Sequence, residues 1–200
     1  MIIIKSKRNL ETIVEEIRKF SFSYLEKYAP SRQQLRTYLL KKFLNYQNTY
    51  VGKGELLNLI DLVISDLEKN KFISDKFYSE SKTKKFIKKG YSINKIRNYL
   101  INKGIDEKYI NNSISKVNIK DKDQDFFSAI KTCKKRRIGP NREEGNRTIF
   151  YKKDLSILAR SGFNYEISKE VLDLSKKEYE KFLKLLWYFI FFCFFLLNKN

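Results

Sequence analysis

The sequence predicts an all-α protein, built as an elongated array of three tandem three-helix, helix-turn-helix-like repeats with an apolar C-terminal tail. Apolar residues recur at three and four positions along most of the chain, as one face of an α-helix requires. Both prolines fall between such stretches, and no convincing strand-like alternation appears. One helix is written twice, because "SRQQLRTYLLKKF" from Ser31 returns as "SINKIRNYLINKG" from Ser92, 61 residues later. Such repetition indicates one supersecondary unit used again.

The first repeat is predicted over residues 1–70. A long amphipathic helix has Asn9 in a position that fits an N-cap, and Pro30 interrupts its apolar pattern. Ser31 and Gln34 then fit a capping box that opens the helix written twice. A polar loop follows, and a third amphipathic helix completes the repeat.

The second repeat is predicted over residues 71–118 and has the same order of elements. Its first helix opens at Ser74 and stops at Gly90, a residue that commonly terminates helices. Ser92 caps the second copy of the repeated helix, and Gly104 closes it. A short third helix follows, so the similarity extends beyond the two quoted peptides.

The third repeat is fainter and is predicted over residues 119–180. A helix runs into the basic segment "KTCKKRR", and "LSILARSGFNYEISKEVL" supplies two more helices on either side of Gly162. The peptide "ARSGF" parallels "INKGI" of the second repeat. This parallel places a third copy of the unit at the end of the array.

The tail, residues 181–200, departs from this pattern. Leu185 to Leu197 form an uninterrupted apolar run of 13 residues, whereas a bilayer-spanning helix needs roughly 17 to 25. A terminal helix that packs on the rest of the protein or drives self-association is therefore favoured. The alternative is that the apolar run anchors the protein in a membrane and the helical repeats act as an adaptor at the membrane surface. We expect a monomer that does not contact membranes.

The residue types present restrict the chemistry. The chain has no histidine, which removes histidine triads, histidine bases and most zinc sites. Cys133 and Cys193 lie too far apart for a metal motif or a disulfide framework, so reduced thiols in the cytoplasm are expected. With no nucleophile paired to a base and no glycine-rich phosphate loop, the sequence predicts no catalytic residue, cofactor or metal.

The charge of the chain predicts an anionic partner. A formal net charge of +19 and a pI near 9.8 suit nucleic acid, an acidic membrane surface or an acidic protein groove. A charged face can also simply keep a surface helix soluble, and cations near helix C-termini favour the dipole. The candidate partner-binding residues are Arg32, Arg36, Lys41, Lys95, Arg97, Lys103, Lys134, Lys135, Arg136 and Arg137. Tyr38 and Tyr99 are assigned to core packing, since each lies on an apolar face.

Several segments in order resemble one known family. They are "YAPSRQQLRTYLLKKF", "LEKNKFISDKFYSESKTKKFIKKGYSINKIRNYLINKGIDEKYI" and "ARSGFNYEISKEVL". Together, over about residues 20 to 176, they resemble the RecX regulators of the recombinase RecA. Asp75 and Phe77 match the family's helix start, and the "KGI" ending and closing "GF…VL" follow. Phe43 departs from it, standing where the family often has glycine.

The resemblance implies a non-enzymatic modulator. Proteins of this family are three tandem three-helix repeats that lie in the groove of a RecA filament on single-stranded DNA. There they limit filament growth, ATP hydrolysis and strand exchange. The alternative is a helix-turn-helix-like protein that binds naked duplex DNA, with the repeated helices in major grooves. The two hypotheses differ in whether the partner is the assembled filament or DNA alone.

Overall fold

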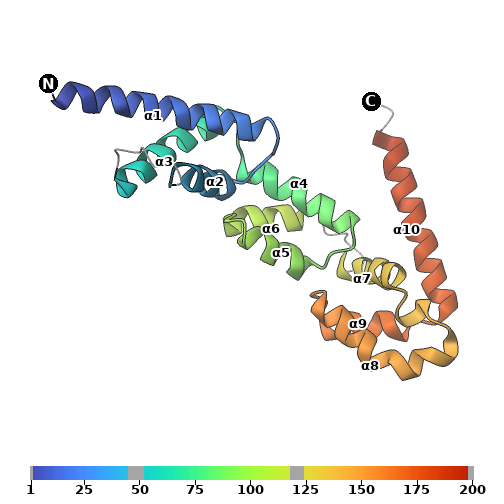
Figure 1. Cartoon of the computed structure of the whole chain (residues 1–200). Helices are drawn as coiled ribbons and strands as arrows, with labels where there is room; N and C mark the ends of the chain where they lie inside the picture. Colours follow the sequence, from blue (N-terminus) through green and yellow to red (C-terminus); the bar gives the residue numbers. More distant parts are fainter. Residues whose placement is uncertain (1, 45–51, 118–123, 198–200) are drawn as a thin grey trace. The chain divides into compact units, whose positions relative to one another are not determined.

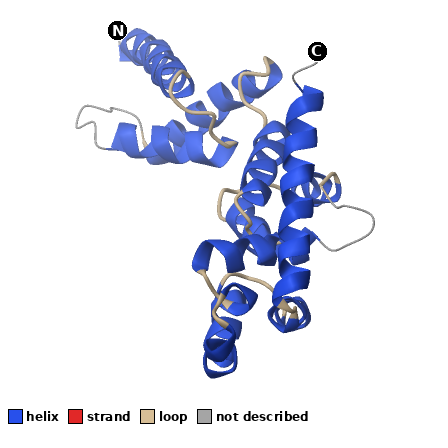
Figure 2. Ribbon diagram, turned by 90° about the vertical axis from the view of Figure 1, so that its right-hand side faces the viewer, coloured by secondary structure: helices blue, strands red, loops and turns tan. Residues whose placement is uncertain are grey.

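The computed structural model describes the backbone of residues 2–44, 52–117 and 124–197 (Figure 1). Side chains are described for residues 10–44, 52–117 and 124–186. Every regular element in these ranges is a helix, and the described part of the chain contains no strand (Figure 2). The predicted all-α class is confirmed.

The helices of the described ranges follow one another as three sets of three and a final helix. The first module comprises α1 (Ile2–Leu25), α2 (Arg32–Leu44) and α3 (Lys53–Lys69). The second comprises α4 (Asp75–Lys88), α5 (Ile93–Ile101) and α6 (Glu107–Ser115). The third comprises α7 (Gln124–Arg136), α8 (Glu144–Arg160) and α9 (Tyr165–Asp173), with the 3₁₀-helix η1 (Gly139–Asn141) after α7. Last is α10 (Lys176–Leu197).

Two helix starts differ from the sequence-based expectation. α1 begins at Ile2 rather than after Asn9, because no proline or glycine interrupts the preceding segment. α10 begins at Lys176, before the predicted tail, because Ser175 and Glu178 form a capping box there. The apolar run is thus the second part of a longer helix whose first turns are polar.

The helices pack into two compact units. One contains residues 1–80 and 100–110, and the other contains residues 81–99 and 111–200. Each of α4, α5 and α6 contributes residues to both units, so neither unit coincides with one repeat. The division of the chain at residues 70, 118 and 180 stays a prediction.

The core of the first unit lies between α1, α2 and α3. Ile17 of α1 and Leu35 and Leu39 of α2 are fully buried there, against an apolar face of α3. The predicted capping box holds the start of α2, since Gln34 N–H donates to Ser31 Oγ (3.2 Å) and Ser31 N–H donates to Gln34 Oε1 (3.1 Å). Sequence periodicity and local capping therefore agree in this unit.

The core of the second unit joins α7, α8, α9 and the first part of α10. Phe126 of α7 packs edge-on against Phe182 of α10, with 5.1 Å between ring centroids. Tyr179 is buried, and its hydroxyl donates to the carbonyl oxygen of Ile130 (3.4 Å). The described part of α10 therefore packs on the third module, while Leu185 is half exposed.

Residues of the second module hold the N-terminus of α2, in a set of contacts that we call the first joint. The Ser31 hydroxyl donates to the carbonyl oxygen of Lys103 (2.7 Å). The Arg32 N–H donates to Asp75 Oδ1 (2.8 Å). Burial raises the pKa of Asp75, and the hydrogen bond from Arg32 opposes that shift. One orphan N–H group at the helix start is thereby satisfied from another module.

The second joint repeats this arrangement at the N-terminus of α5. The Ser92 hydroxyl donates to the carbonyl oxygen of Ser161 (2.8 Å), and the Ile93 N–H donates to Asp125 Oδ1 (2.7 Å). Ser92 also accepts a hydrogen bond from the Lys95 N–H (3.2 Å). A second serine and a second aspartate, equivalent to Ser31 and Asp75, therefore connect the second module to the third.

A glycine closes each joint. Gly104 has a φ of +71°, and a Cβ at this position would lie 2.6 Å from Gln33 Cβ. Gly162 has a φ of +90°, and a Cβ there would lie 2.5 Å from Ser92 Oγ. Only glycine combines the left-handed backbone with this close approach.

Gly104→Ala tests the first joint. We expect it to lower the free energy of unfolding by about 1–3 kcal/mol, because it adds backbone strain and a clash with Gln33. Gly54→Ala is the matched control, since nothing lies within 4 Å of a Cβ at Gly54. Urea unfolding followed by circular dichroism gives both values, and equal stability of the two variants would contradict the closed joint.

Deletion of residues 185–200 tests whether the modules depend on the apolar run. We expect cooperative unfolding to persist with a small loss of stability, because Tyr179 and Phe182 remain to close the core. Thermal unfolding of the truncated chain is the measurement. A broad, non-cooperative transition would place the apolar run inside the core.

Candidate partner interface

The positive charge is concentrated in one of the two compact units. The second unit has 26 Lys and Arg against 11 Asp and Glu, whereas the first has 16 against 12. Residues 81–99 alone contain seven Lys and Arg and no acidic residue. A bias in overall composition would affect both units, so this asymmetry makes the second unit the better candidate for contact with an anion.

The arginines predicted in the first module are held by acidic residues of the same module. Arg36 forms a two-fold ion pair with Asp61, at 2.7 Å from Nε to Oδ1 and 2.9 Å from Nη2 to Oδ2. The arrangement raises the pKa of Arg36 and lowers that of Asp61, chiefly through the side-chain hydrogen bond. Arg32 is ion-paired with Glu68. Of the three predicted cations of α2, Lys41 alone is exposed.

Two of the cations predicted in the second module, Lys95 and Arg97, each contact a neutral residue. The Lys95 ammonium lies over the ring of Tyr91, 4.5 Å from its centroid. Arg97 donates from Nη2 to Asn111 Oδ1 (2.9 Å). Asn111 of α6 and Asp61 of α3 both belong to the third helix of their module. Arg97, the second copy of Arg36, therefore contacts an amide where Arg36 contacts a carboxylate. Lys103 is half-buried, and its carbonyl oxygen accepts the Ser31 hydroxyl in the first joint.

The four cations predicted at the end of α7 are all exposed. Lys134, Lys135 and Arg136 belong to the last turn of the helix, and Arg137 follows it with a φ of +54°. None of the four forms an ion pair with a residue in the described part of the chain. The helix dipole favours such a placement, but four adjacent cations also repel one another. This segment is therefore available to an anion.

Lys131 is a cation that the sequence-based selection missed. It is half-buried, and burial lowers the pKa of its ammonium group. The turn after α4 lies beside it, since a Cβ at Gly90 would lie 3.0 Å from Lys131 Cβ and the Thr132 hydroxyl donates to the Gly90 carbonyl oxygen (3.0 Å). Lys131 opens the basic run "KTCKKRR", which was the one available signal.

The predicted roles of the two tyrosines agree with their packing. The Tyr38 ring stacks on Tyr24 with 4.2 Å between centroids. The Tyr99 ring packs edge-on against Phe86 at 4.7 Å. Both are half-buried, so their rings take part in packing within the modules.

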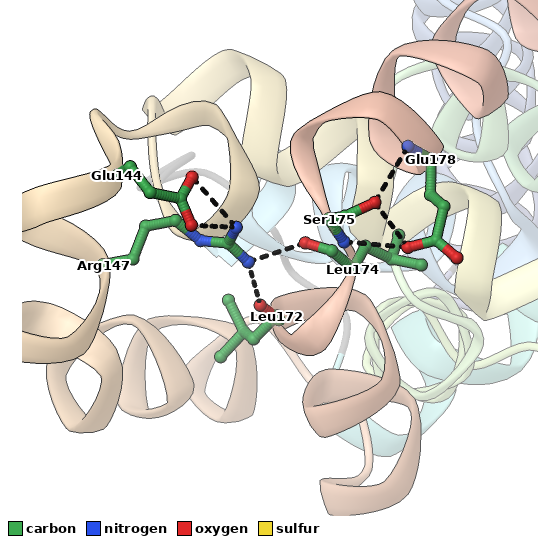
Figure 3. Close-up of polar contacts among 6 residues, drawn as sticks. All are labelled: Glu144, Arg147, Leu172, Leu174, Ser175 and Glu178. Atoms are coloured by element: carbon green, nitrogen blue, oxygen red, sulfur yellow. Dashed lines mark hydrogen bonds and ion pairs between the residues drawn. The ribbon is translucent and has the colours of Figure 1, made fainter.

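Arg147 serves the internal architecture of the third module (Figure 3). Its Nη2 donates to the carbonyl oxygens of Leu172 (2.9 Å) and Leu174 (2.6 Å), and its Nη1 pairs with Glu144 (3.2 Å). These carbonyls belong to the end of α9 and the turn into α10. Arg147 thus fixes that turn to α8 and is not a candidate for partner contact.

The described side chains were also surveyed for catalytic or metal chemistry. No group of three His, Cys, Asp or Glu among them could hold a metal ion. Cys133 is buried, which raises the pKa of its thiol to about 12, so the thiol stays protonated at neutral pH. Asp121 and Asp123 lie outside the described residues.

No helix in the described part of the chain combines the length and the apolar character needed to cross a bilayer. The fold and these surfaces define a basic, all-α repeat protein with exposed cations. No known family model matches the chain. The comparisons with individual proteins do identify relatives.

The chain resembles two curated regulatory proteins named RecX. It is 29% identical to that of Myxococcus xanthus (strain DK1622) over 152 residues, which cover 75% of this chain and 80% of the relative. It is 31% identical to that of Clostridioides difficile (strain 630) over 130 residues, 62% of this chain and 57% of the relative. The match thus spans little more than half of the second relative.

Two crystal structures share the fold. One is of a regulatory protein RecX, with a TM-score of 0.59 and 17% identity over 82% of this chain and 74% of that one. The other is of RecX from Lactobacillus salivarius, with a TM-score of 0.58 and 18% identity over 82% of this chain and 98% of that one. In sequence and in fold, the chain is therefore similar to RecX regulatory proteins. The resemblance found in the sequence is confirmed.

A double-mutant cycle of Arg36→Ala and Asp61→Ala tests the ion pair of the first module. We expect a coupling energy of about 0.5–1 kcal/mol at pH 7, because both side chains are partly exposed. The pKa of Asp61 is lowered from 3.8 in the folded state. The coupling is therefore present above the unfolded pKa and is lost as the pH falls through the lowered folded value.

Urea unfolding at pH 7 and at about pH 2 measures this coupling. The control is the equivalent cycle on Arg97 and Asn111, in which the amide does not titrate. A coupling energy for Arg36 and Asp61 that is the same at both pH values would contradict the ion pair.

Proposed function

We propose that this protein regulates the recombinase RecA without catalysis. It binds in the groove of the RecA filament on single-stranded DNA and limits filament growth, ATP hydrolysis and strand exchange. It acts as a monomer in the cytoplasm and requires neither a cofactor nor a metal ion. The similarity to two RecX regulatory proteins supports the regulatory role.

The observation that carries this proposal is the exposed cation cluster of α7 on the more basic unit. Lys134, Lys135, Arg136 and Arg137 lack intramolecular ion pairs in the described part of the chain. A filament of protein and single-stranded DNA supplies acidic side chains and phosphates to meet such a surface. Modules repeated along one chain add further weak contacts, which reinforce one another through effective concentration.

The alternative, a helix-turn-helix-like protein on naked duplex DNA, requires α2 to present its cations to a major groove. Arg32 and Arg36 are instead ion-paired with Glu68 and Asp61 of their own module. The exposed cluster lies on α7, which is the first helix of its module and not a copy of the repeated one. These contacts favour the filament as the partner.

Reversal of charge on α7 tests the proposal. We expect Lys135→Glu with Arg136→Glu to weaken inhibition of DNA-dependent ATP hydrolysis by RecA roughly five- to thirtyfold, since each exposed charge contributes about 0.5–1 kcal/mol. Wild-type protein is also expected to co-sediment with RecA filaments in preference to naked single-stranded or duplex DNA. The ATPase assay across protein concentrations gives the shift in half-inhibition.

The control reverses two exposed lysines of the first unit, Lys53→Glu and Lys69→Glu, which changes the net charge equally. It should inhibit nearly as well as wild type. If wild type sediments equally with naked duplex and with filaments, the alternative replaces this proposal. Arg36→Glu is unsuitable here, because it would set two carboxylates together at Asp61.

A further inference from the structure

The two joints share a scaffold but differ in charge. Their hydrogen bonds match Ser31 with Ser92, Asp75 with Asp125 and Lys103 with Ser161, which fixes equivalent positions on each helix. Five cations belong to the segments of the second joint, namely Lys88, Lys89, Lys95, Lys131 and Arg160. In the same order, the equivalent positions of the first joint hold Lys27, Tyr28, Gln34, Ser81 and Asn102. The hydrogen bonds of a joint do not require these cations, because the first joint forms with a single cation, Lys27, at the five equivalent positions.

These five residues, the joint cations, start from backbone segments in mutual contact within the second unit. The α4 end approaches α7 where Gly90 lies against Lys131 and accepts from Thr132. The α8 end approaches α5, since a Cβ at Gly162 would lie 3.5 Å from Lys95 Cβ. The five cations therefore start from four helices, α4, α5, α7 and α8, whose ends or sides meet around the second joint.

Intramolecular partners do not account for the joint cations. None of the five forms an ion pair with a described residue. Lys95 lies in the first turn of α5, where the helix dipole disfavours a positive charge. Lys131 is half-buried at mid-helix, where burial disfavours its charged form. Both positions cost stability, which a bound anion would offset.

The aromatic residue at this place does not offer a stacking surface. Tyr91 is stacked on Phe86, with 5.0 Å between centroids and 4° between the ring planes, and the Lys95 ammonium lies over the same Tyr91 ring. A base would have to displace one of these neighbours. The second joint therefore offers positive charge but no free aromatic surface on which a base or an apolar side chain of a peptide could pack.

We propose that the joint cations bind backbone phosphates of a nucleic-acid strand, independently of its sequence. This rests on the proposed function, in which the strand is the one carried by the filament. Phosphates fit because they provide charge at regular intervals and need only cations in return. The second joint is thus a contact point in its own right, distinct from the cluster at the end of α7.

The test is the variant Lys89→Gln, Lys131→Gln and Arg160→Gln in the full chain. Binding to a fluorescent oligothymidylate of about 20 nucleotides is measured by anisotropy at several salt concentrations. We expect Kd to rise roughly tenfold or more near 0.1 M salt and the log–log salt slope to fall by about 2, that is, about 0.7 for each lost phosphate contact. Removing the Lys131 charge should leave the melting temperature unchanged or raise it.

The matched control is Lys27→Gln, Lys53→Gln and Lys69→Gln, which removes three exposed cations from the first unit. Less than a twofold change in Kd is expected. Equal losses in the two triple variants would overturn the proposal, because net charge alone would then explain binding. Competition by polyglutamate as strong as that by unlabelled oligothymidylate would also overturn it in favour of acidic protein segments.

The same variants in the RecA ATPase assay separate this proposal from the proposed function. A wild-type protein that binds the oligonucleotide through the joint cations but does not inhibit RecA would leave the joint site standing and remove the regulatory role. A joint variant with normal oligonucleotide binding and normal folding would remove the joint site, whatever its effect on RecA.

Discussion

The serine hydroxyl that opens the second helix of a module is the interaction on which the array depends. It accepts the N–H of its own helix and donates to a carbonyl oxygen of the next module, so one oxygen completes a cap and a docking contact. An aspartate from that next module takes the adjacent N–H. Because both contacts satisfy groups that a helix start leaves unpaired, a module separated from its neighbour would lose local and tertiary stability together.

This constraint also explains how the surface is divided between structure and binding. In the first module the cations of α2 face acidic residues of α3 and serve packing. In the second module the arginine equivalent to Arg36 contacts an amide, and in the third module Lys134, Lys135, Arg136 and Arg137 form no ion pair with a described residue. A repeated scaffold permits this divergence, since the serine, aspartate and glycine of each joint preserve the fold while exposed positions change charge.

Much of this fold follows from sequence periodicity, whereas the joints do not. The helices and the capping box of Ser31 and Gln34 depend on residues within one turn of each other, which a local pattern reveals. The partner of Arg36 lies 25 residues away and that of Ser31 lies 72 away, so only packing brings them together. Sequence reasoning thus found the basic segments but not which cations have internal partners, and it did not select the half-buried Lys131.

The middle module carries both halves of the connection. It offers Asp75 and the Lys103 carbonyl to the module before it, and it presents Ser92 and the Ile93 N–H to the module after it. The outer modules need only one half each. A duplication of the middle segment would therefore generate a longer array without any new kind of contact, so the length of such proteins is open to change by recombination within a single gene.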